Sequence, residues 1–102
     1  MTGYRCYAEN LMRKLLMGYR IYFNHDVLNS DGRRIFEDIL RSMIYSKEYH
    51  PGLFKQARRN PCLENILKIA KILLPEDEIR EIIMTSIEGP VRNDYWRLLY
   101  RE

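Results

Sequence analysis

Apolar residues recur every three or four positions along most of the chain, which is the spacing of one face of an amphipathic α-helix. Proline, glycine and asparagine interrupt this pattern and divide it into segments of helical length. Valine and threonine together number only four against 23 isoleucines and leucines, so the mixture that favours strands is missing. The sequence therefore predicts an all-α fold of about six helices, over residues 4–23, 31–44, 53–59, 61–74, 75–87 and 94–100.

The predicted helix ends depend on capping residues and prolines. Ser30 or Asp31 can cap the second helix. Asn60 followed by Pro61 is typical of an N-cap with proline at the first helical position, and Pro75 opens the next helix in the same way.

The length of 102 residues fits one domain, so we expect a single domain over residues 1–102. No apolar run approaches the roughly 20 residues that a membrane-spanning helix requires. The first residues also lack the basic and then apolar pattern of a secretory signal. We therefore expect an intracellular protein with no membrane partner.

The use of charged and aromatic residues is biased. Arginine outnumbers lysine by twelve to five, glutamate outnumbers aspartate by nine to five, and the chain has eight tyrosines but a single glutamine, Gln56. In this composition and in size the chain resembles the small orphan proteins of filamentous viruses of hyperthermophilic archaea. The resemblance implies the host cytoplasm as the location, but it contains no motif and assigns no functional residue.

Two parts of the chain are similar to each other. Residues 9–12 match residues 64–67, then 37–43 match 81–87, and Phe54-Lys55 matches Trp96-Arg97 in the same order. These matches predict a degenerate tandem repeat of three helices, residues 7–59 and 62–101. The alternative is that any two amphipathic helices align through their hydrophobic period. A true repeat would place a groove between its copies, where a peptide could bind.

No set of residues has the spacing of a catalytic or metal site. The possible zinc ligands include no close pair, and they are Cys6, Cys62, His25 and His50. The two cysteines are either free, buried thiols or a disulfide. The acidic cluster over residues 76–81 is explained by the start of a helix, where the dipole favours acids. We therefore expect no enzymatic activity, no metal and no cofactor.

Aromatic and arginine side chains favour a protein or peptide partner. Tyrosine, tryptophan and arginine are enriched at protein interfaces. These side chains gather in and before the third helix of each predicted repeat unit. A protein or peptide partner, or a second molecule of this protein in a homodimer, would bind them in the groove. The candidate residues are Tyr45, Tyr49, Phe54, Tyr95, Trp96, Arg97 and Tyr100.

The alternative is a small viral DNA-binding or transcription-regulating protein. Residues 1–61 carry eleven basic and six acidic residues, whereas residues 62–102 carry six and eight. Residues 66–87 resemble a helix-turn-helix, but their second helix begins with acids that would face phosphates. The nucleic-acid candidates are therefore the earlier basic residues, although such residues also form ordinary solvated helix faces. They are Arg33, Arg34, Lys55, Arg58 and Arg59.

Overall fold

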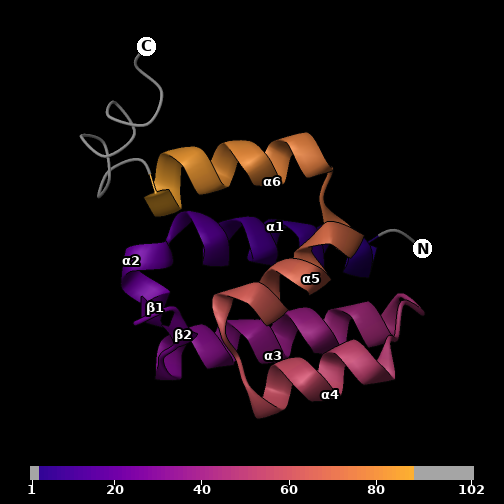
Figure 1. The fold of residues 1–102 in the computed structure, drawn as a ribbon. Coiled ribbons are helices and arrows are strands. Elements are labelled where there is room, and N and C mark those ends of the chain that lie inside the picture. Colours follow the sequence, from indigo (N-terminus) through magenta and orange to yellow (C-terminus); the bar gives the residue numbers. More distant parts are fainter. Residues whose placement is uncertain (1–2, 89–102) are drawn as a thin grey trace.

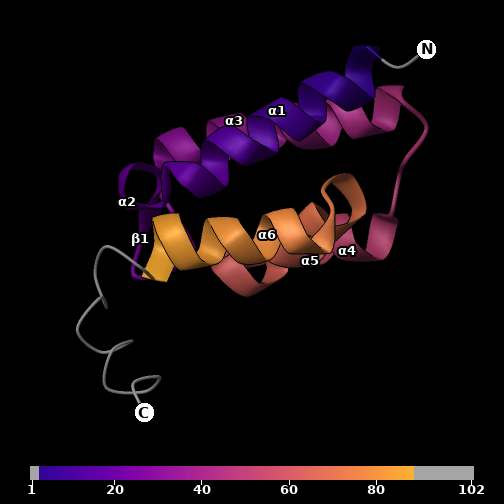
Figure 2. The ribbon, with the colours of Figure 1, turned by 90° about the horizontal axis from the view of Figure 1, so that it is seen from above.

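The computed structural model describes residues 3–88, and its helices form two layers (Figures 1 and 2). The first layer contains α1 (Gly3–Met17), α2 (Tyr19–Tyr22) and α3 (Ser30–Tyr45). The second contains α4 (Pro51–Arg59), α5 (Leu63–Leu73) and α6 (Glu76–Ile82), and α6 continues as the π-helix η1 (Ile83–Glu88). The predicted all-α class is confirmed. The sheet within residues 3–88 is a very small hairpin of two strands, β1 (Phe23–Asn24) and β2 (Val27–Leu28).

The hydrophobic core lies between the two layers. The start of α1 meets the end of α3, so these two helices are antiparallel, and they pack along most of their length. Their buried residues follow the helical spacing that the sequence predicts, and each fully buried large side chain contributes about 1.5–3 kcal/mol. From the first layer the core contains Ala8, Met12, Leu15, Leu16, Phe36, Ile39, Leu40 and Met43. From the second layer it contains Phe54, Ala57, Ile66, Ile69, Ala70, Leu73, Leu74, Ile79 and Ile82.

Two arginines of α1 connect the layers through polar contacts. Arg13 donates from Nε to a carboxylate oxygen of Glu78 on α6 at 2.5 Å, and this hydrogen bond raises the pKa of Arg13. Arg5 donates from Nη2 to the carbonyl oxygen of Ile72 on α5 at 2.9 Å. It also pairs with Glu9 and with Glu48, and the hydrogen bond to Glu9 is the main cause of its raised pKa.

The C-terminal end of α3 places Glu48 beside Arg5. The Glu48 N–H donates to the carbonyl of Met43 at 2.8 Å and the Lys47 N–H to that of Ile44 at 3.0 Å, the bond pattern of a Schellman motif. Lys47 occupies the left-handed position of this motif with φ 66°, where glycine is more usual. The motif turns the chain so that the Glu48 carboxylate meets the first helix.

The predicted helix over residues 4–23 is wrong in its continuity, because the chain divides at Gly18. A Cβ at Gly18 would lie 2.7 Å from the ring of Tyr22, so the ring packs where a side chain would otherwise be. α2 then ends at Tyr22, and Phe23 begins β1.

A hairpin replaces the loop that the sequence predicts after this helix. His25 and Asp26 form its turn with φ 55° and 65°, the positive values that a type I′ turn requires. Asn24 pairs with Val27 across the turn, and the Tyr19 hydroxyl hydrogen-bonds the Asp26 carboxylate. Neither turn residue is the usual glycine, so tertiary contacts rather than local preference fix this turn.

Two predicted helix caps are also wrong. Asn29, not Ser30 or Asp31, caps α3, and its Oδ1 accepts the Gly32 N–H at 2.8 Å. Asn60 is the C-cap of α4 rather than the N-cap of the next helix.

The hairpin explains why α5 starts later than predicted. The carbonyl of Pro61 accepts the Leu28 N–H at 3.0 Å, and Cys62 forms an antiparallel bridge with Val27. These bonds hold Cys62 in an extended conformation, so the helix begins at Leu63.

The predicted repeat remains a prediction. Its last helix, 94–100, lies outside the described residues. α1 packs closely along α3, whereas α5 and α6, the corresponding pair, make few contacts.

None of the helices within residues 3–88 has the length and apolar character needed to cross a membrane.

Candidate binding surface

The five basic residues predicted to contact nucleic acid all lie on α3 and α4. These helices form one edge of the molecule, the lower edge in Figure 1. All five side chains are exposed. We call this surface the basic face, and it consists of Arg33, Arg34, Lys55, Arg58 and Arg59.

One acidic residue joins the two parts of the basic face. Arg58 donates from Nε and from Nη2 to the two carboxylate oxygens of Glu37, each at 3.2 Å. Arg33 and Arg34 precede Glu37 by four and three residues, so they lie within one turn of this ion pair. The pair connects α3 and α4, but it is almost half exposed and adds little stability.

The other four cations of the basic face have no acidic partner among the described residues. Arg33, Arg34, Lys55 and Arg59 form none of the salt bridges found within residues 3–88. The nearby Arg41 is paired with Asp38 at 2.9 Å. An excess of positive charge is therefore exposed along this edge.

The hydrophobic pattern of α4 directs its basic residues outward. Phe54 and Ala57 are buried against the core, so the intervening positions face solvent. Arg58 and Arg59 lie in the last turn of α4, where the helix dipole favours cations by about 0.3–1 kcal/mol each.

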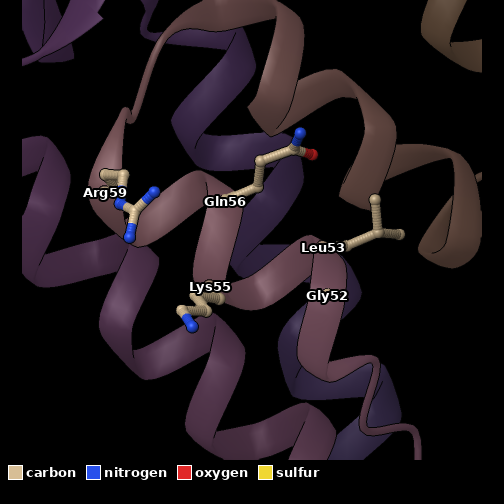
Figure 3. A pocket seen from close by; sticks show the side chains of 5 residues that line it. All are labelled: Gly52, Leu53, Lys55, Gln56 and Arg59. Atoms are coloured by element: carbon tan, nitrogen blue, oxygen red, sulfur yellow. The ribbon is translucent and has the colours of Figure 1, made fainter.

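A shallow depression lies on the outer side of α4 (Figure 3). Its volume is about 570 Å³, and its lining residues recur on one side of the helix. Lys55 and Arg59 project from one side of the depression, while Leu53 and Gln56 project from the other (Figure 3). The lining residues are Gly52, Leu53, Lys55, Gln56 and Arg59.

Sequence analysis missed three of these five residues, Gly52, Leu53 and Gln56. The spacing of positions 52, 56 and 59 could have placed Gly52 and Gln56 beside Arg59 on one helix face.

The edge opposite the basic face is acidic. α6 lies at the upper edge in Figure 1, and its first turn contains three acids. Glu76, Asp77 and Glu81 are exposed, and Glu78 is paired with Arg13. The acids of α6 and the basic face thus lie on opposite edges of the molecule.

The structure changes the set of predicted aromatic contacts. Phe54 is only 1% exposed, so its prediction as a partner-binding residue is wrong, because it faces the core from α4. Tyr45 and Tyr49 are 59% and 55% exposed, and the Tyr49 ring meets Phe54 edge-on at 5.3 Å. The other four predicted contacts lie outside the described residues, and they are Tyr95, Trp96, Arg97 and Tyr100.

Two exposed tyrosines of α1 were missed by sequence analysis. The ring of Tyr4 lies 5.1 Å from that of Tyr45, measured between centroids, and both rings are about half exposed. Tyr7 is 52% exposed and lies one turn further along the same side of α1. We call Tyr4, Tyr7 and Tyr45 the tyrosine surface. The spacing of Tyr4 and Tyr7 in the predicted helix over residues 4–23 resembles that of core residues, so sequence analysis did not single them out, whereas Tyr45 was already a predicted partner contact.

Both cysteines are free thiols. Cys62 is partly buried, but Cys6 is exposed, so the prediction of a buried thiol is wrong at Cys6. Within residues 3–88, no three His, Cys, Asp or Glu residues are grouped so that they could hold a metal ion.

No protein-family model matches the chain, and comparisons with curated proteins and with solved structures gave no match. The candidate function therefore rests on the surface itself.

Proposed function

We propose that this protein is a non-enzymatic binding module that binds nucleic acid through its basic face. The observation that carries the proposal is the group of four exposed cations, on two neighbouring helices, without acidic partners among the described residues. The acidic edge around α6 lies on the opposite side and would stay away from a bound polyanion. The charge separation therefore favours one orientation of the protein on a phosphate backbone.

The number of cations sets the expected salt dependence. Each phosphate that a cation neutralises contributes about −0.7 to −0.9 to the slope of log K against log salt. With four free cations in contact, we expect a slope of about −3 to −4. Binding should be sequence-tolerant and weak, with a Kd of about 10⁻⁶ to 10⁻⁴ M at physiological salt.

Fluorescence anisotropy with labelled oligonucleotides tests the proposal between about 50 and 200 mM salt. The variant Arg34→Ala/Arg59→Ala should reduce the salt slope by about two. The matched control Arg20→Ala/Arg80→Ala removes two exposed arginines outside the basic face. It should reduce the salt slope by less than half as much. Equal effects of the two double variants, or no binding at low salt, would contradict the proposal.

A protein partner is the second candidate, and the tyrosine surface favours it. Tyr4 and Tyr45 already pack against each other while about half of each side chain stays exposed. Tyrosine provides a large contact area at low entropic cost and is common at interfaces. A second copy of the chain is the simplest partner to test.

Sedimentation velocity over a range of concentrations measures self-association. Tyr4→Ser/Tyr45→Ser should shift a dimer to monomer, whereas the control Ile21→Ser, at an exposed apolar residue of α2, should not. A wild-type chain that stays monomeric throughout would exclude the homodimer. The predicted groove has a separate test, because partner binding that survives loss of Trp96 and Tyr100 would exclude those anchors.

A further inference from the structure

We infer that the depression on α4 holds one nucleotide of an unpaired strand, so that the preferred ligand is single-stranded nucleic acid. This inference rests on the proposed function and names the form of nucleic acid that the basic face binds. Three properties of the depression support this inference: the two neighbouring cations Lys55 and Arg59, the amide of Gln56 and the free space at Gly52.

The two cations are placed to share one phosphate. Lys55 and Arg59 are four residues apart on α4, so their side chains lie on the same side of the helix (Figure 3). The arginine fork can bind two phosphate oxygens, and the lysine ammonium adds a flexible point charge.

The opposite side of the depression suits a base rather than a second phosphate. The amide of Gln56 has both donors and an acceptor, whereas a phosphate at neutral pH offers only acceptors. Base edges present both kinds of group, and glutamine can form two hydrogen bonds with adenine. Leu53, which is partly buried beside Gln56, supplies apolar surface for the base or the sugar.

Gly52 leaves the space that a base needs. A Cβ at Gly52 would meet no heavy atom within 4 Å, so this end of the depression is open. The volume of about 570 Å³ lies within the range of small-ligand sites, about 300–1,000 Å³. A base inside a stacked duplex cannot enter such a site, whereas single strands present unpaired bases that can turn out towards the protein.

Two variants test the depression without removing a positive charge. Gly52→Met fills the open space, and Gln56→Leu removes the amide while keeping a helix-forming side chain. Each should weaken single-strand binding about tenfold at fixed salt, the loss expected for a pair of base contacts. Neither should change the salt slope, because neither contacts a phosphate. The control Gly3→Met adds the same side chain at another glycine with open surroundings and should bind like the wild type.

The assay compares one labelled strand with its duplex by fluorescence anisotropy, and circular dichroism checks the fold of each variant. We expect the single strand to bind at least fivefold more tightly than the duplex, and the two variants to remove that preference. Because they alter separate parts of the depression, one folded variant is enough to decide. A duplex that binds equally well, or unchanged single-strand binding in the folded variants, would overturn the inference.

This result is distinguishable from failure of the proposed function. If Arg34→Ala/Arg59→Ala still flattens the salt slope while Gly52→Met and Gln56→Leu have no effect, phosphate binding stands and the nucleotide site is wrong. If no oligonucleotide binds at low salt, both are wrong.

Discussion

Phe54 gives the sharpest test of whether the fold is right. The sequence pattern made this residue a candidate partner contact, but in the structure its side chain lies on the buried side of α4 and is only 1% exposed. Its ring meets the exposed rings of Tyr49 at 5.3 Å and His50 at 6.3 Å. Phe54→Ala should therefore reduce stability rather than remove an interaction surface.

The size of the effect follows from burial. Replacing a buried phenylalanine by alanine costs about 3–5 kcal/mol, through lost transfer free energy and the cavity that remains. Tyr49 and His50 are exposed and can move partly into the space, so we expect about 3–4 kcal/mol. This is a large share of the roughly 5–15 kcal/mol that stabilises a typical domain.

Urea denaturation followed by circular dichroism measures this loss. With a slope of about 1–1.5 kcal/mol per molar urea, the midpoint should fall by roughly 2–4 M. The control Tyr45→Ala truncates an aromatic side chain that is 59% exposed and should cost less than about 1 kcal/mol. If Phe54→Ala were as stable as Tyr45→Ala, the position of α4 against the core would be refuted.

The other predictions concern the polar contacts and turns that fix the fold, and thermal or urea unfolding measures each of them. Asn29→Ala should cost about 1 kcal/mol, since it removes the side-chain cap of α3; no loss would contradict the cap. Gly32→Ala should cost about 1–3 kcal/mol, because its Cβ would lie 2.5 Å from the backbone oxygen of Tyr22, and a neutral result would show that the end of α2 lies further from α3. Lys47→Gly should stabilise by about 0.5–1 kcal/mol by relieving a positive φ, and a loss of stability would argue against the Schellman motif. Arg5→Met should cost about 2 kcal/mol by leaving Glu48 without its cation, and a double-mutant cycle with Glu48→Gln should give a coupling energy clearly above zero.

Much of the helical architecture follows from the sequence. The three-four spacing of apolar residues is a local property, and it defined α3, α4, α5 and α6 to within a few residues. The shortage of valine and threonine correctly excluded a sheet-based fold. The same spacing directed the α4 cations outward, so the basic residues could be named before their surroundings were known.

The hairpin was decided by tertiary contacts. The sequence His25-Asp26 carries no strong turn signal, yet backbone bonds from Leu28 to Pro61 and from Leu63 to Asp26 hold it in place. These bonds join segments more than 30 residues apart, and no local propensity encodes them. They also explain why Asn60, a good N-cap in isolation, does not start α5.

Exposure of the aromatic side chains also depended on the packing of the layers. Phe54 and Tyr4 both fit a helical hydrophobic pattern, but only Phe54 faces the opposite layer. A helix periodicity defines a face and does not say which part of that face a neighbour covers. The sequence alone therefore determined α3, α4, α5 and α6 to within a few residues, and it named the residues of the basic face. Packing of the two layers decided that these residues share an edge. The reason is that α3 and α4 belong to different layers and lie side by side only in the folded protein.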